Sequence, residues 1–351
     1  MRLVLTEDLT QEMKLAKAIY DNDNILLNKG VKNLHQYKDR LLELGIDYLY
    51  VEDKYSADIE LKPVIKEKSR RQGKKVIKKT LDKISEGLSQ NDIKELKGLV
   101  DEISSQIILN DEVLLNLHSL KRTSEYTYEH SLNVGVISIA IAKILGYSRN
   151  DICKIGMGGM LHDTGKKLIP EKILKKPARL TDSEYDIMKN HPQLGFEELQ
   201  KLETISPLSR TMVFSHHERW DGTGYPRGLK GEETHVFARI AAIADVFDAL
   251  SSSRVYRDKM PVHKALEYIM HHTETLFDYQ IVKKILPKIS FYPNGSEVIL
   301  STGERGIVKA QNSGFPTRPI IRIIQSSTGK EKDAELDLLK HMNIVIEEVI
   351  A

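Results

Sequence analysis

Five histidines and two aspartates between residues 130 and 245 are of the residue types that hold metal ions. They occur as a His-Asp pair, a His-His pair, two single histidines and one aspartate inside an apolar segment. Imidazole nitrogens and carboxylate oxygens bind divalent transition metals, and a carboxylate can bridge two ions with its two oxygens. The candidate ligands are His130, His162, Asp163, His191, His216, His217 and Asp245.

Asp245 lies within the apolar run of residues 238–250, where its carboxylate is difficult to expose. Burying an unpaired carboxylate costs several kcal/mol, so Asp245 needs a cation or a hydrogen-bonding partner. A helix end or an arginine would satisfy that need, and a single histidine is more often structural than a ligand. Seven potential ligands at successive predicted helix ends or cores nevertheless favour a metal centre over coincidence.

The donor set narrows the kind of site. Five imidazoles and two carboxylates suit iron, manganese, zinc or cobalt better than magnesium, which prefers oxygen ligands. The single cysteine, Cys153, excludes a thiolate zinc site and an intramolecular disulfide framework. Gly165-Lys166 lacks the flanking residues of a Walker phosphate loop, and His217-Glu218 lacks the second histidine of a zinc-protease helix.

The bulk composition is that of an ordinary globular protein. The chain has 351 residues, of which 40% are hydrophobic and 29% charged, with a formal net charge of +2. This balance provides no strong field for a nucleic-acid polymer or a membrane surface. The longest apolar stretch, residues 134–145, is too short for a bilayer span of roughly 20 residues, and Glu7 and Asp8 are untypical of a signal peptide. We therefore expect a cytoplasmic protein with no membrane insertion.

The elements that must position these residues are mostly helical. Apolar residues recur at offsets of three and four in residues 93–117, and further helices punctuated by prolines are expected at 131–145, 150–162, 182–191, 207–217, 238–250 and 262–271. On this pattern His130 opens one helix and His191 ends another. Short strands are expected at 3–5 and 48–51 around a helix at 34–44, and further strands at 298–300, 306–308, 320–324 and 344–346.

The predicted fold is mainly α, with a small α/β N-terminal module and a small β-rich C-terminal appendage. The predicted boundaries are 1–55 for the module, 56–113 for a basic linker with helices, 114–289 for the catalytic domain and 290–351 for the appendage. The basic residues of the linker, such as Arg70 and Arg71, are interpreted as the outer face of a solvated helix. The apolar stripe of residues 96–107 could either pair two subunits in a homodimer or pack on the catalytic domain.

Six motifs in order resemble the HD superfamily of metal-dependent phosphohydrolases, and more closely its HD-GYP branch. The resemblance covers about residues 114–286, roughly half of the chain. The motifs are His130-Ser131, His162-Asp163-Thr164-Gly165-Lys166, residues 176–181 with His191-Pro192, residues 216–226, residues 244–250 and residues 254–257.

The resemblance implies an all-helical HD-type catalytic domain that hydrolyses cyclic di-GMP to pGpG or GMP. It implies two divalent metal ions, with iron or manganese favoured and zinc, cobalt or nickel as alternatives. Tyr126 stands where some members carry a glutamate for a third metal, so two ions are expected. The implied roles are one metal at His162, Asp163 and Asp245 with His130 nearby, a second at His191, His216 and His217, Asp163 as the bridge, and Lys166, Tyr225, Arg254 and Arg257 as substrate contacts.

The chemistry of such a centre agrees with the implied reaction. Two ions can polarise a phosphodiester and lower the pKa of a shared water, so that a metal-bridging hydroxide attacks phosphorus. Besides Asp163, Lys166 is the predicted catalytic residue, because its ammonium can neutralise charge that develops on the phosphate. Two alternatives remain open: an HD-type phosphohydrolase for another cyclic dinucleotide or nucleotide, and a catalytically silent cyclic di-GMP receptor.

Overall fold

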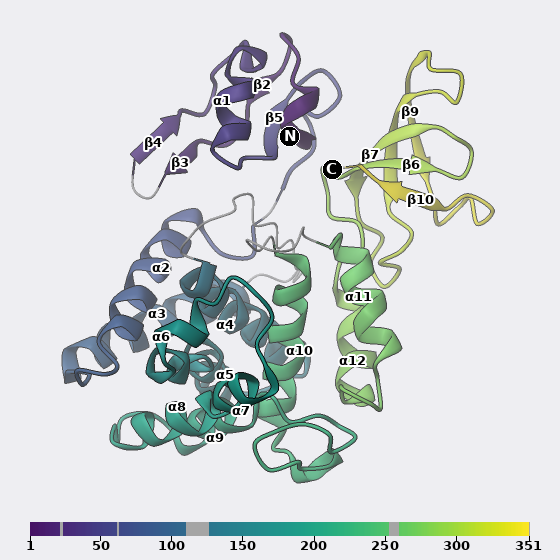
Figure 1. Cartoon of the computed structure of the whole chain (residues 1–351). Coiled ribbons are helices and arrows are strands. Elements are labelled where there is room, and N and C mark those ends of the chain that lie inside the picture. The colour runs from purple at the N-terminus through teal and green to yellow at the C-terminus, as the bar shows by residue number, and fades with distance from the viewer. Residues whose placement is uncertain (22–23, 62, 110–125, 253–259, 351) are drawn as a thin grey trace.

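A computed structural model describes residues 1–21, 24–61, 63–109, 126–252 and 260–350. The fold is mainly helical, with a small N-terminal α/β module and a C-terminal sheet, as the sequence predicts. The module and the sheet lie side by side at one end of the helical body (Figure 1). Within the described residues, no helix combines the length and the apolar character needed to cross a membrane.

The N-terminal module is built around a three-stranded antiparallel sheet in the order β1-β5-β2. The predicted helix at 34–44 is divided into a 3-10 turn and a short α-helix, and Gly45 ends it in the left-handed conformation (φ +69°). A two-stranded ribbon, β3-β4, projects from the module. The elements are β1 (Arg2–Leu5), η1 (Thr6–Asp8), β2 (Lys14–Leu15), β3 (Ile19–Asp21), β4 (Asn24–Leu27), η2 (Leu34–Tyr37), α1 (Lys38–Glu43) and β5 (Tyr48–Glu52).

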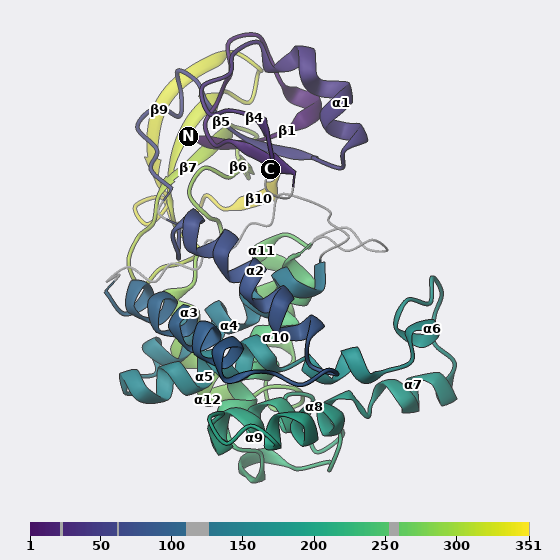
Figure 2. The same ribbon diagram turned by 90° about the vertical axis from the view of Figure 1, so that its left-hand side faces the viewer.

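The helical body surrounds α4, whose residues 130–142 are all buried and mostly apolar. The longer helices are α2 (Glu67–Asp82), α3 (Gln90–Ile108), α4 (Tyr126–Ile144), α5 (Arg149–Leu161), α8 (His191–Gln200), α9 (Pro207–Ser215), α10 (Val236–Ser251) and α11 (Val262–His271). Shorter ones connect them: η3 (Thr164–Leu168), α6 (Glu171–Leu174), α7 (Asp182–Met188), η4 (Gly231–Glu233), α12 (Tyr279–Ile285) and η5 (Leu286–Lys288). Helices α6 and α7 project to one side of the body (Figure 2).

The apolar stripe of α3 packs inside the helical body. Leu96, Val100 and Ile103 are buried in the same core as α4 and α5. The structure thus shows the packing alternative for this stripe, and a homodimer stays a prediction. Residues 110–117 of the predicted helix, and the predicted boundary at 113, lie outside the described residues; the other boundaries also stay predictions.

The C-terminal part is a five-stranded antiparallel sheet in the order β10-β6-β7-β8-β9. Its strands are β6 (Glu297–Leu300), β7 (Arg305–Ala310), β8 (Ile320–Gln325), β9 (Glu331–Asp337) and β10 (Ile346–Val349). Strand β9 was not predicted, because this edge strand is mostly charged and exposed and shows no apolar alternation. The run predicted at 344–346 enters the sheet only at Ile346.

Two arginines join the N-terminal module to the C-terminal sheet. Arg2 in β1 donates to Asp53 at 2.8 Å and to the buried Glu297 of β6 at 2.6 Å. Arg322 in β8 forms a two-pronged pair with Asp58 at 2.5 and 2.8 Å. Because a buried charge must be paired, Arg2 and Glu297 hold β1 of the module beside β6 of the sheet.

Gly165 in η3 lies against the backbone of α8. A Cβ atom at this position would stand 1.9 Å from the carbonyl oxygen of His191 and 2.6 Å from the amide nitrogen of Gly195. Such distances are far below van der Waals contact, and backbone atoms cannot move aside as a side chain can. The close approach of η3 to α8 therefore requires glycine at 165.

We predict that Gly165→Ala lowers stability by at least about 3 kcal/mol, because the new methyl group forces η3 away from α8. Gly98→Ala is the matched control, since Gly98 is exposed in α3 with no atom within 4 Å of the added Cβ. The control should be about 1 kcal/mol more stable than the wild type, from helix propensity alone. Thermal unfolding followed by circular dichroism measures both, and an unchanged midpoint for Gly165→Ala would contradict this packing.

Candidate metal centre

The seven candidate ligands come from the ends or interiors of five helices. His162 and Asp163 follow α5, His216 and His217 follow α9, and Asp245 lies within α10. Two predicted placements were wrong: His130 lies one turn inside α4, and His191 opens α8 instead of ending α7. The cause in the second case is Pro192, which cannot donate inside a continuing helix but is favoured in the first turn of a new one.

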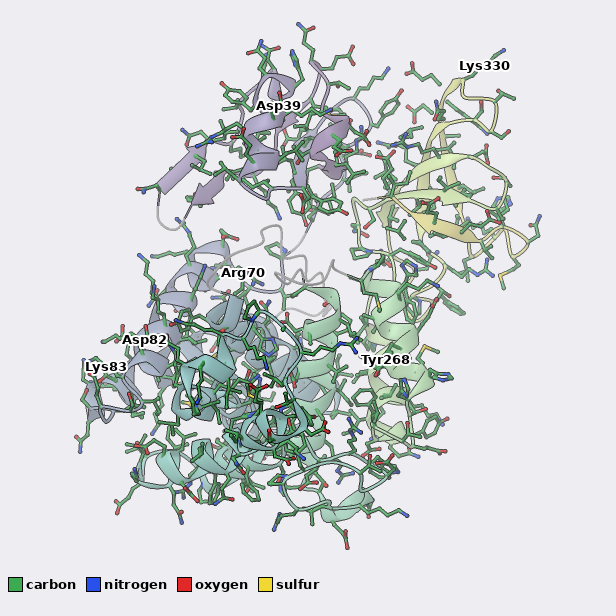
Figure 3. All side chains as sticks on the ribbon, in the orientation of Figure 1. Asp39, Arg70, Asp82, Lys83, Tyr268 and Lys330 are labelled. Carbon is green, nitrogen blue, oxygen red and sulfur yellow. The ribbon has the colours of Figure 1, made fainter. Side chains whose placement is uncertain are left out.

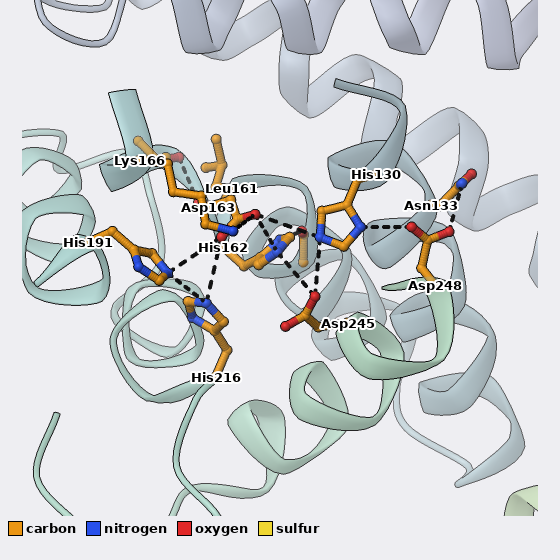
Figure 4. Close-up of polar contacts among 12 residues, drawn as sticks. His130, Asn133, Leu161, His162, Asp163, Lys166, His191, His216, Asp245 and Asp248 are labelled. Carbon is orange, nitrogen blue, oxygen red and sulfur yellow. Dashed lines mark hydrogen bonds and ion pairs between the residues drawn. The ribbon is translucent and has the colours of Figure 1, made fainter. Parts of the chain in front are cut away.

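The structure brings the seven side chains into two adjacent groups. His130, His162 and Asp245 form one group, and Asp163, His191, His216 and His217 form the other, each with its ligand atoms within 4.8 Å of one another. Figure 4 shows Asp163 between them.

The two oxygens of Asp163 face different groups. Oδ2 is 3.2 Å from Nε2 of His162, and Oδ1 is 3.5 Å from Nε2 of His191. Oδ2 also lies 3.6 Å from Nε2 of His130. A carboxylate in this position can bridge two ions, each bound by one group.

Three of the histidines have the same hydrogen bond on the outer side of the ring. Nδ1 lies 2.7–2.8 Å from a backbone carbonyl oxygen three residues earlier in His162, His191 and His216. A carbonyl oxygen can only accept, so Nδ1 carries the proton and Nε2 presents a lone pair to the centre. This is the tautomer that a metal requires, fixed by the outer hydrogen bond.

Two buried polar atoms at the centre have no hydrogen-bond partner among the described residues. They are Nε2 of His162 and Oδ1 of Asp163. Nε2 of His191 and Nε2 of His216 lie only 3.3 Å apart, with lone pairs directed at each other. Buried polar atoms are normally satisfied, and facing lone pairs repel, so divalent cations fit this donor set.

The surroundings hold most of these groups in their ligand forms. Burial lowers the pKa of His191 to about 4, that of His217 to about 3, and that of His216 well below its usual value. Burial alone would raise the pKa values of Asp163 and Asp245, but His162 and Lys166 beside Asp163, and His130 beside Asp245, outweigh burial and hold both pKa values well below the usual value. Neutral imidazoles and ionised carboxylates result.

His130 differs from the other histidines because two carboxylates contact it. Burial lowers its pKa, but the hydrogen bonds and charges of Asp245 and Asp248 outweigh burial and raise the pKa to about 9. Nε2 lies 3.1 Å from Asp245, on the side of the centre, and Nδ1 lies 2.7 Å from Oδ2 of Asp248. A proton on Nε2 therefore occupies the place that a metal ion would take.

Of the predicted substrate contacts, two can be located. Lys166 is part of η3, with Nζ 2.7 Å from Oδ2 of Asp163 and its side chain 28% exposed. Tyr225 stacks on His217 with ring centroids 4.7 Å apart. Arg254 and Arg257 lie outside the described residues.

The loop that carries Tyr225 is held by Glu218. This buried carboxylate accepts from the backbone amides of Arg227 at 2.8 Å and Leu229 at 3.0 Å. A Cβ at Gly224 would lie 2.4 Å from the amide nitrogen of Arg219, so the loop also closes on itself. Burial raises the pKa of Tyr225, which keeps its phenol protonated and able to donate a hydrogen bond.

Sequence reasoning gave no role to Asp248 and Asn133. Asp248 lies three residues after Asp245 in α10, and its Oδ1 accepts from Nδ2 of Asn133 at 2.8 Å. The signal for Asp248 was the one used for Asp245, a carboxylate inside an apolar run. Asn133 gave a weaker signal, as a single amide in the apolar helix α4.

Comparison with protein families gives two matches along the chain. Residues 108–281 match the HD domain, and residues 297–351 match a KOW domain associated with the HD domain. The first match contains every candidate ligand, and the second contains the C-terminal sheet.

Individual relatives are similar over part of their length. The chain is 36% identical to cyclic di-GMP phosphodiesterase PA4108 of Pseudomonas aeruginosa, over 68% of this chain and 58% of the relative. It is 42% identical to the cyclic di-GMP phosphodiesterase response regulator RpfG of Xanthomonas campestris, over 42% of this chain and 39% of the relative. It is 37% identical to the 3'3'-cGAMP-specific phosphodiesterase 3 of Vibrio cholerae, over 49% of this chain and 37% of the relative.

One solved structure shares the fold over most of the chain. It is the HDG"Y"P protein Bd1817 of Bdellovibrio bacteriovorus, with a TM-score of 0.53 and 17% identity, covering 81% of this chain and 97% of that one. The fold, the ordered motifs and the matches over residues 108–281 agree. The chain therefore belongs to the HD-GYP branch of the HD domain family.

Proposed function

We propose that this protein is a metal-dependent phosphodiesterase that hydrolyses cyclic di-GMP to pGpG, GMP or both. The observation that supports it best is the position of Asp163, whose two oxygens face two separate groups of histidines. A phosphodiester is an anion that repels an attacking hydroxide, and paired divalent ions are the usual means of overcoming that repulsion.

In this proposal the two groups hold two divalent ions, with iron or manganese favoured by the nitrogen-rich donor set. His130, His162 and Asp245 would hold one ion and His191, His216 and His217 the other, with the carboxylate of Asp163 available to both. When bound, the ions supply Lewis-acid activation of the phosphate and of a water molecule.

The other residues of the site act on the substrate directly. The ammonium of Lys166 is positioned by Asp163 and partly exposed, so it can pair with a phosphate oxygen and neutralise charge that develops there. Tyr225, stacked on His217 and protonated, can donate to the same phosphate or to a ribose oxygen. Arg254 and Arg257 stay predicted phosphate contacts.

The relatives support a cyclic dinucleotide as the substrate, but they differ in which two bases it carries. PA4108, RpfG and a Thermotoga maritima relative are named cyclic di-GMP phosphodiesterases, whereas three Vibrio cholerae relatives are named for 3'3'-cGAMP. Because the chain covers 58% or less of each relative's length, their activities are proposals for this chain. Cyclic di-GMP is the first choice, and 3'3'-cGAMP the second.

Hydrolysis by the metal-loaded protein tests the proposal. Protein purified without oxygen and supplied with Fe(II) or Mn(II) should convert cyclic di-GMP to pGpG or GMP. The variant His162→Ala/Asp163→Ala should lose roughly 1000-fold or more in rate, because it removes the bridge and one further ligand. Chromatography of the products measures both, with 3'3'-cGAMP assayed in parallel.

The outcomes separate the three candidate functions. Faster turnover of 3'3'-cGAMP than of cyclic di-GMP would make 3'3'-cGAMP the preferred substrate and would leave the proposed reaction unchanged. Tight binding of cyclic di-GMP without turnover, with two metals bound, would instead indicate a receptor.

The neighbouring lysines Lys166 and Lys167 provide a matched pair of variants. Lys166→Met should lower kcat about 100-fold, because a positive charge is lost next to the reacting phosphate. Lys167→Met should change kcat less than about twofold, since Lys167 forms a partly exposed pair with Asp82 at 2.5 Å, and such pairs contribute little. Both variants should still bind two metals by elemental analysis, and equal losses of kcat would refute the role of Lys166.

A further inference from the structure

Helix α2 lies outside the segment that matches the HD domain, yet its Arg70 is hydrogen-bonded to Asn133, a neighbour of the candidate metal centre. It follows the N-terminal module in the chain and packs on α4 in the helical body. Figure 3 shows Arg70 toward the end of α2 that faces the module, with Asp82 and Lys83 at the opposite end. Sequence analysis assigned this basic stretch to a solvated face, and Arg70 departs from that expectation.

Three hydrogen bonds connect Arg70 to the metal ligand His130. The guanidinium of Arg70 donates to Oδ1 of Asn133 at 2.8 Å, and Nδ2 of Asn133 donates to Oδ1 of Asp248 at 2.8 Å. Oδ2 of Asp248 lies 2.7 Å from Nδ1 of His130. Figure 4 shows the inner part of this series, from Asn133 to His130.

The direction of each bond follows from the chemistry of Arg70. A guanidinium only donates, so it holds the oxygen of the Asn133 amide and turns the NH2 group toward Asp248. Asp248 then receives the amide at one oxygen and the Nδ1–H of His130 at the other. With Nδ1 protonated, His130 directs Nε2 toward Asp245, which is the orientation of a metal ligand.

Burial makes this series sensitive to the loss of one member. His130, Asn133 and Asp248 are buried, whereas Arg70 is partly exposed and forms the outer end. Without Arg70, the oxygen of the Asn133 amide loses its cationic donor, so the amide is held less firmly in the position from which it donates to Asp248. A buried polar network is least stable when one of its hydrogen bonds is missing. The loss of the Arg70 bond would therefore also weaken the hold of Asp248 on His130.

We propose that Arg70 is a positioning residue for the metal centre, acting through Asn133 and Asp248 on the tautomer and orientation of His130. The inference rests on the proposed function in that His130 is taken as a metal ligand. The same turn of α2 also contacts the N-terminal module, because the guanidinium of Arg71 lies 4.6 Å from the ring centre of Tyr20 in β3. This turn of α2 therefore contacts both the module and the ligand network.

Mn(II) binding, measured by titration calorimetry, tests the proposal without using activity. The wild type should bind two ions, and Arg70→Met should weaken one of them roughly tenfold while leaving the other unchanged. Arg71→Met is the matched control, one residue away on the same helix, and should change neither affinity more than about twofold. Arg70→Lys keeps a cationic donor toward Asn133, so it should retain most of the affinity.

A double-variant cycle separates positioning from a general loss of structure. Asp248→Asn should weaken the same ion by roughly 10- to 100-fold, and adding Arg70→Met to it should cause little further loss. Additive losses, equal weakening of both ions, or an Arg70→Met isotherm like that of the wild type would overturn the proposal. A wild type that binds fewer than two ions would overturn the proposed function as well, which distinguishes the two failures.

Discussion

The carboxylate of Asp163 is the group on which the arrangement of the helical body depends. It is buried among four histidine rings with one oxygen toward each group of ligands, and a charge so placed must be compensated. Helices α5, α8, α9 and α10 end or pass where their side chains can provide that compensation and could also hold a cation. The outer hydrogen bonds of four histidines, to backbone carbonyls in His162, His191 and His216 and to Asp248 in His130, orient Nε2 of each ring toward the centre.

Close backbone contacts fix the positions of the site residues. Gly165 allows η3 to lie on the first turn of α8, which sets the distance between Asp163 and His191. Glu218 and Gly224 close the loop that places Tyr225 on His217. These contacts involve backbone atoms, so they constrain the site more tightly than flexible side chains would.

The parts outside the HD match are attached by buried or partly buried polar contacts. Arg2 and Glu297 join the N-terminal module to the C-terminal sheet, while α2 and α3 complete the core around α4. Arg70 in α2 donates to Asn133, which is hydrogen-bonded to Asp248 beside the candidate ligand His130. The helical body that supports the site therefore extends beyond the residues 108–281 that match the HD domain, because it includes α2 and α3.

The sequence by itself identified the candidate ligands, most helix positions and the β-rich end. Residue type, apolar periodicity and ordered motifs are local properties, which is why they can be read from the chain. Only the tertiary structure decided the distances between the seven ligands, that His191 opens a helix, that the α3 stripe packs inward, and that charged β9 joins a sheet. The pairing of His130 with Asp248 and the contact of Arg70 with Asn133 join residues 118 and 63 positions apart, which local patterns do not encode.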